Sequence, residues 1–170
     1  LLLSRDELSV TRRLDRKSLF KRRAAGTDRQ IQHIAANVDT IFIVTSCNAD
    51  FNVARLERYL ALARDAEVTP VIVLTKADTT ESAETFVQEA AALLPGLMVV
   101  VLDARNDKSA ARLAPWFGIG QTVALVGSSG VGKSTLVNTL IGNDYIATRS
   151  VREDDDKGRH TTTARTLHRL

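Results

Sequence analysis

The sequence predicts an α/β protein in which helices cover both faces of a mostly parallel sheet, giving three layers. Two observations lead to this prediction. Short β-branched apolar runs, typical of strands buried on both faces, occur at residues 40–45, 71–74, 97–102 and 122–126. Stretches that are apolar at helical spacing alternate with these runs, as in parallel strands joined by right-handed crossovers.

The predicted helices are placed by their apolar spacing and by the signals at their ends. Asp50 is a candidate cap for a helix over residues 51–64. A second helix covers residues 82–94 and is stopped by Pro95 and Gly96. A third, short helix is expected over residues 108–113, before the last of the four strands.

The run that follows this last strand fits the phosphate-loop pattern G-x-x-x-x-G-K-[ST]. It consists of Gly127, Ser128, Ser129, Gly130, Val131, Gly132, Lys133, Ser134 and Thr135. A helix over residues 136–141, ended by Gly142, comes next, so the run has the strand and the helix that the pattern requires. Gly127, Gly130 and Gly132 let the backbone adopt unusual dihedral angles and approach an anion closely. The sequence therefore predicts a nucleoside-triphosphate site, against the alternative of a glycine-rich turn with an incidental lysine.

Two residues of this loop have predicted roles in chemistry. Lys133 is expected to span the β- and γ-phosphates and to spread the charge that develops during hydrolysis. The hydroxyl of Ser134 is expected to bind Mg²⁺.

Two further polar segments come directly after predicted strands. One consists of Thr75, Lys76, Ala77 and Asp78, and the other of Asp103, Ala104 and Arg105. Ligands of parallel sheets bind at the carboxyl ends of strands, so we expect both segments to meet the phosphate loop at one edge.

The first of these segments predicts which base is bound. The Asp78 carboxylate can accept both N1–H and the exocyclic amine of guanine, a pair of donors that adenine lacks. The stem of Lys76 is expected to pack along the base or the loop. Many GTPases carry Asn where this chain has Thr75, which still offers a hydroxyl. The alternative is that Asp78 only caps the next helix.

Length and composition limit the class of protein. The 170 residues suffice for one domain with a sizeable core, and no apolar run reaches membrane-spanning length. The single cysteine, Cys47, excludes an internal disulfide or a cysteine-based zinc site within this stretch, and we expect it to be a small buried residue at a strand end. Nothing near residue 1 resembles a signal peptide, so we expect a cytoplasmic protein that does not enter a membrane.

Positive charge is concentrated near the beginning of the sequence, although the net charge is only +3. The basic residues there are Arg12, Arg13, Arg16, Lys17, Lys21, Arg22, Arg23 and Arg29. Such a cluster either contacts a polyanion, which we favour, or is a solvated tail. We expect residues 1–30 to be the end of a preceding domain followed by a linker, and residues 31–170 to form the nucleotide-binding domain.

An ordered set of motifs resembles the circularly permuted GTPases of the RsgA (YjeQ) family. The set comprises residues 34–39, Asp50 with Phe51, residues 58–60, residues 75–78, residues 127–135 and residues 158–163. Here the phosphate loop follows residues 75–78, the predicted guanine segment. In ordinary GTPases the phosphate loop precedes the corresponding segment. The same sheet can form from either order, because termini lie at the surface and permutation is tolerated.

The resemblance implies a late assembly factor that binds the small (30S) ribosomal subunit and its rRNA and hydrolyses GTP. GTP, GDP and Mg²⁺ are then the expected ligands, and a monomer is the expected state. Zinc belongs to a family domain that lies outside this sequence. Because the sequence also ends before the family's second switch, we expect a piece of a longer protein that binds nucleotide but hydrolyses it poorly.

The resemblance also implies roles for single residues. Residues 103–105 take the place of the family's base-supporting Ser-Ala-Lys loop, and residues 158–163 that of its first switch. Thr162, with Thr161 as the close alternative, is then the Mg²⁺-binding threonine. His160 is the candidate that orients the attacking water, because the family has an apolar residue in place of the usual glutamine. The alternative for His160 is an exposed loop histidine.

Two other classes of function stay open at this point. One is a nucleotide-gated rRNA-binding or ribosome-binding module with little hydrolysis of its own. The other is an ATP-dependent P-loop enzyme, which Asp78 disfavours.

Overall fold

A four-stranded sheet forms the centre of the computed structural model, which describes residues 2–3, 10–12, 15–23, 31–142 and 167–168. All four strands are parallel, in the order β7-β6-β5-β8. Their bounds are Thr40–Ser46 (β5), Thr69–Thr75 (β6), Met98–Val101 (β7) and Val123–Val126 (β8). The last of these four strands along the chain thus pairs with the first, which brings distant segments of the sequence together.

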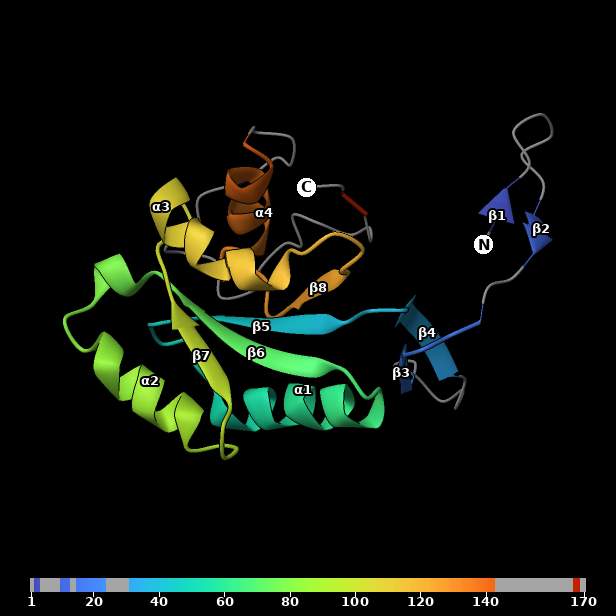
Figure 1. Ribbon diagram of the computed structural model, residues 1–170. Coiled ribbons are helices and arrows are strands. Elements are labelled where there is room, and N and C mark those ends of the chain that lie inside the picture. Colours follow the sequence, from blue (N-terminus) through green and yellow to red (C-terminus); the bar gives the residue numbers. More distant parts are fainter. Residues whose placement is uncertain (1, 4–9, 13–14, 24–30, 143–166, 169–170) are drawn as a thin grey trace.

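Helices cover both faces of this sheet (Figure 1). One face carries α1 (Val53–Asp65) and α2 (Ala83–Ala91), and the other carries α3 (Asp107–Ala110), the 3₁₀ helix η2 (Ala111–Trp116) and α4 (Lys133–Ile141). Successive side chains of a strand point to opposite faces. In β5, Ile41 and Ile43 accordingly belong to the core under α1 and α2, and Phe42 and Val44 to the core under α4 and η2. The predicted three-layer α/β fold is confirmed.

The register of the sheet determines where the phosphate loop begins. Ile43 of β5 pairs with Val126, the last residue of β8, while β5 continues to Ser46, which pairs with Thr75 of β6. The chain that leaves β8 therefore passes alongside the end of β5. The segments after β5, β6 and β8 all start at this edge of the sheet.

The cap of α1 differs from the prediction. Asn52, and not Asp50, is the N-cap residue, because the Asn52 side chain accepts a hydrogen bond from the backbone N–H of Arg55 at 2.9 Å. Asp50 lies two residues earlier and forms an ion pair with the Arg55 guanidinium instead. Both residue types cap helices well, so the sequence alone did not separate them.

Strands occur before residue 31, in the segment predicted to be the end of a preceding domain followed by a linker. Short antiparallel pairs form between β1 (Leu2–Leu3) and β2 (Val10–Arg12), and between β3 (Leu19–Arg23) and β4 (Ile31–Ala36). Phe20 is 4% exposed and belongs to the same core as Ile41, so this basic segment does supply a core residue. The domain boundary at residue 30 stays a prediction, although β3 and β4 pair across it.

Two other expectations have different outcomes. Cys47 is buried directly after β5, as predicted. The sequence also predicts a strand over residues 164–170, but apart from Leu167 and His168 these residues lie outside the described part of the chain. In the described part of the chain, no helix has the length and apolar character needed to cross a membrane.

Candidate nucleotide-binding site

The phosphate loop has a backbone that only glycine tolerates at its first position. Gly127 has a φ of 149°, and a Cβ added there would lie 2.1 Å from the carbonyl oxygen of Val44. Gly130 and Gly132 also have positive φ, 79° and 93°. These glycines therefore adopt the unusual backbone dihedral angles that the sequence predicts for them. Directly after them α4 begins at Lys133, so the positive N-terminal end of this helix lies at the loop.

The ammonium group of Lys133 lies within this loop. Its Nζ donates to the carbonyl oxygen of Gly127 at 3.0 Å and to that of Ser128. Burial lowers the pKa of Lys133, and the Asp50 carboxylate acts in the opposite direction. A partly desolvated cation among backbone carbonyls is well placed to be attracted to an incoming phosphate.

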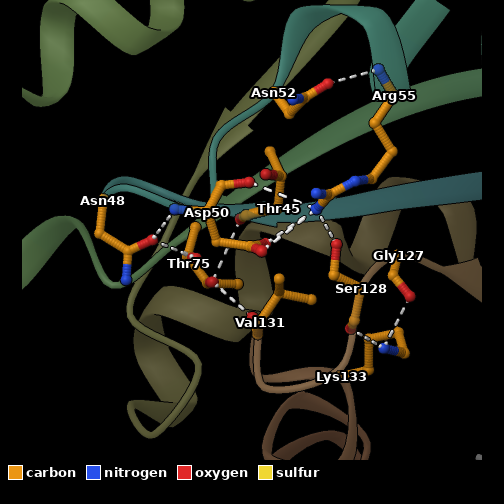
Figure 2. A network of polar contacts seen from close by, with 11 residues as sticks. Thr45, Asn48, Asp50, Asn52, Arg55, Thr75, Gly127, Ser128, Val131 and Lys133 are labelled. Atoms are coloured by element: carbon orange, nitrogen blue, oxygen red, sulfur yellow. Dashed lines mark hydrogen bonds and ion pairs between the residues drawn. The ribbon is translucent and has the colours of Figure 1, made fainter. Parts of the chain in front are cut away.

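Thr75 joins the predicted guanine segment, residues 75–78, to the phosphate loop (Figure 2). It is the last residue of β6 and fully buried, and its Oγ1 lies 2.7 Å from the carbonyl oxygen of Val131 and 3.2 Å from that of Thr45. Lys76 follows with a φ of 56°, in the left-handed region, and leads into a 3₁₀ turn, η1 (Ala77–Thr79). Asp78 is exposed in that turn, and a carboxylate accessible to a ligand is what base recognition requires.

The third predicted segment lies against the same loop and against α4. The carbonyl oxygen of Ala104 accepts a hydrogen bond from Thr139 of α4 at 2.7 Å, and a Cβ added at Gly132 would lie 3.7 Å from the Cβ of Ala104. The Asp103 side chain accepts from the backbone N–H of Arg105 at 2.9 Å. Asp in place of the family's Ser therefore still closes a tight turn here.

The predicted site residues thus fall into two groups. The segments at residues 75–78, 103–105 and 127–135 are brought together at one edge of the sheet, and Ser134 lies in the first turn of α4. Residues 158–163, including His160, Thr161 and Thr162, lie outside the described residues. The individual roles given to these residues stay predictions.

A polar network between β5 and α1 belongs to the site and was not predicted from the sequence. The side-chain oxygen of Asn48 accepts from the Ser46 hydroxyl at 2.8 Å and from the backbone N–H of Asp50 at 3.0 Å. Asp50 in turn accepts from Arg55, whose guanidinium also donates to the Ser128 hydroxyl (Figure 2). The strand-end rule that located the other segments applies equally to the end of β5 and would have found this loop.

These observations define a class of protein. A parallel α/β sheet with a glycine loop ahead of a helix, and with a second polar segment bonded to that loop, is the framework of a P-loop nucleotide-binding protein. The chain belongs to the RsgA GTPase family, whose sequence model matches residues 13–170.

Two relatives illustrate the similarity. The small ribosomal subunit biogenesis GTPase RsgA of Mesorhizobium japonicum is 62% identical over 164 residues, covering 95% of this chain and 47% of the relative. The small ribosomal subunit biogenesis GTPase RsgA 2 of Vibrio parahaemolyticus is 52% identical over 169 residues, covering 99% of this chain and 47% of the relative. The chain spans about half the length of the curated relatives it matches.

Two solved structures share the fold. YjeQ from Thermotoga maritima superposes with a TM-score of 0.60 at 25% identity, over 75% of this chain and 43% of that one. YloQ, described as a circularly permuted GTPase, gives a TM-score of 0.52 at 26% identity, over 68% of this chain and 46% of that one. The predicted family and the predicted permuted P-loop fold are confirmed.

Proposed function

We propose that this chain is the GTP-binding and GTP-hydrolysing part of a factor in the late assembly of the small ribosomal subunit. The observation that carries the proposal is the hydrogen bond between Thr75 and Val131, which joins the guanine segment to the phosphate loop. Both the base and the phosphates of one nucleotide can then be bound at one edge of the sheet. The names of the Mesorhizobium and Vibrio relatives support the assignment to the small subunit.

The phosphates would be held by the loop at residues 127–135 and by the N-terminus of α4. Backbone N–H groups and the Lys133 ammonium would face the phosphate oxygens, where they stabilise the charge that develops as water attacks the γ-phosphate. His160 would orient that water, and exposed Asp78 would accept the two donors of guanine.

The donor set suits a magnesium ion shared with the substrate. Among the described residues, no group of three or more His, Cys, Asp or Glu side chains could hold a metal alone. Mg²⁺ is commonly bound by one or two protein ligands together with substrate phosphates, and the hydroxyls of Ser134 and Thr162 would be those ligands. When bound, Mg²⁺ supplies positive charge that offsets the charge on the phosphate oxygens.

The partners follow from the same proposal. The described basic side chains near the beginning of the chain, those of Arg12, Arg16, Lys17 and Lys21, are exposed and could contact rRNA phosphates. The factor would act in the cytoplasm as a monomer that meets the subunit transiently.

Nucleotide titration tests the assignment directly. Fluorescent GDP is expected to bind the chain much more tightly than fluorescent ATP. Replacing Asp78 with Asn should weaken GDP and admit xanthosine diphosphate, because the amide now donates where the carboxylate accepted. Glu81→Gln is a matched control, since it neutralises an exposed carboxylate close by in the sequence and should change neither affinity. Unchanged guanine preference in Asp78→Asn would refute the base assignment.

Hydrolysis is tested separately with purified small subunits. Multiple turnover of GTP that rises when subunits are added supports the GTPase. GTP-dependent binding to the subunit with unchanged hydrolysis would instead indicate a nucleotide-gated binding module.

A further inference from the structure

One nitrogen of Arg55 links the loop after β5 to the phosphate loop. Its Nη1 lies 3.2 and 3.1 Å from the two carboxylate oxygens of Asp50 and 3.3 Å from the Asp50 carbonyl oxygen. The same nitrogen donates to the hydroxyl of Ser128 (Figure 2). An ion pair outside the three predicted nucleotide-binding segments therefore touches the phosphate loop itself.

Arg55 is attached to a fixed part of the fold. Its backbone N–H is bonded to the N-cap Asn52 in the first turn of α1, and α1 packs on β5 and β6 through buried Leu56. Asp50 is also held in place, because its backbone N–H donates to Asn48. The pair thus presents a positioned donor to the phosphate loop.

Ser128 lies in the half of the loop that Thr75 does not hold. Thr75 is bonded to Val131, beyond the exposed residues Ser129 and Gly130. On the near side of these residues the loop is held by Arg55 at the Ser128 hydroxyl and by Lys133 at the Ser128 carbonyl. The two anchors, Arg55 and Thr75, therefore bracket the part of the loop that would close over phosphate oxygens.

The charges indicate that Arg55 acts on the loop rather than on the phosphate. The two hydrogens of Nη1 are directed to acceptors on Asp50 and Ser128, and the Asp50 carboxylate offsets the guanidinium charge. Both side chains are about one-third exposed, 31% for Arg55 and 35% for Asp50, so the ion pair alone contributes little stability. Its effect should appear in the shape of the loop, and therefore in nucleotide affinity.

We propose that Arg55, oriented by Asp50, is a positioning residue that fixes Ser128 and with it the first half of the phosphate loop. The inference rests on the proposed nucleotide site and adds to it a residue that acts through the loop, without contact with the nucleotide.

A double-mutant cycle tests this inference, with the binding of N-methylanthraniloyl-GDP as the measurement. Arg55→Ala and Ser128→Ala are each expected to weaken binding roughly five- to tenfold, the range of a charge-assisted hydrogen bond reduced by partial exposure. The double variant should be no weaker than either single variant, because both changes remove one contact. Asp50→Asn should weaken binding less, since the amide oxygen still accepts from Arg55.

Two further variants separate positioning from a general effect on folding. Arg55→Lys keeps a cationic donor and should recover part of the affinity. Arg64→Ala removes an exposed arginine from the last turn of the same helix, distant from the loop, and should leave affinity unchanged. Thermal melting without nucleotide shows whether each variant is folded, and Ser128→Ala and Asp50→Asn still test the contact if Arg55→Ala is not.

The outcomes distinguish this inference from the proposed function. Failure of the unaltered chain to bind GDP would overturn both. If the unaltered chain binds GDP but Arg55→Ala binds within about twofold of it, or the effects of Arg55→Ala and Ser128→Ala simply add, the positioning role is wrong and the nucleotide site stands.

Discussion

The hydroxyl of Thr75 lies 2.7 Å from the carbonyl oxygen of Val131, so β6 is bonded directly to a loop 56 residues further along the chain. A threonine suffices for this bond because β6 delivers it fully buried against the loop. Two of the predicted site segments are thus parts of one hydrogen-bonded unit. A change in one segment should be felt in the other.

Replacing Thr75 with Val is expected to destabilise the chain by about 1–3 kcal/mol, because the variant keeps the shape of the side chain but leaves the Val131 carbonyl without its donor. GDP affinity should fall as well, since the loop loses an anchor. Urea denaturation and GDP titration measure the two effects. Thr75→Ser keeps the hydroxyl and should bind GDP almost as the unaltered chain does; a Val variant equal to Ser in both measurements would contradict the prediction.

Replacing Gly127 with Ala is expected to destabilise the fold by about 3 kcal/mol, as the sum of a backbone clash and a strained φ. The added Cβ would lie 2.1 Å from the Val44 carbonyl oxygen, which cannot move without disturbing β5. Gly120→Ala is the control: its φ of 78° is also unfavourable, but no atom lies within 4 Å of the added Cβ. That variant should lose only about 1 kcal/mol. Equal losses in the two variants would show that the backbone at Gly127 does not approach the Val44 carbonyl this closely.

Lys133 is expected to titrate below the ordinary lysine value of 10.5, because burial disfavours its charged form. The lowered pKa means that the unfolded chain binds the proton more readily, so the free energy of unfolding should rise with pH between the folded pKa of Lys133 and 10.5. Asp50→Asn should lower the pKa of Lys133 further, since the carboxylate acts to raise it. Carbon-13 NMR titration of the lysine Cε atoms measures both shifts, and a Lys133 value at or above 10.5 would refute the burial argument.

Cys47 is expected to react very slowly with a thiol reagent such as DTNB while the chain is folded. The residue is 1% exposed, and burial raises the pKa of its thiol, so little reactive thiolate is present. In the denatured chain the reaction should be complete within minutes. The labelling rate of the folded chain therefore measures how often the structure around Cys47 opens. An exposed thiol at the next-but-one position, Ala49→Cys in a Cys47→Ala background, should react at once in the folded chain. Equal rates for the two positions would contradict the burial of Cys47.

Local patterns in the sequence determined the four central strands, the helices between them and the phosphate loop. Apolar runs such as the one over β5 leave few alternatives, because a strand buried on both faces must be apolar along its length. The dihedral angles of Gly127 and Gly132 were also predictable, since the motif requires glycine where φ is positive. Chemistry that depends on one residue type at a fixed spacing can be read from one segment alone.

Tertiary structure decided what depends on two segments at once. Asn and Asp are equally good N-cap residues in isolation. In the folded chain, the backbone N–H of Arg55 donates to the side chain of Asn52, while the Arg55 guanidinium forms an ion pair with Asp50, so Asn52 is the cap. Phe20 lies in a basic segment that looks like a linker, yet pairing of β3 with β4 directs it into the core. The contact of Arg55 with Ser128 depends on β8 pairing beside β5, and no local pattern carries that information because the two residues meet only when the sheet is assembled.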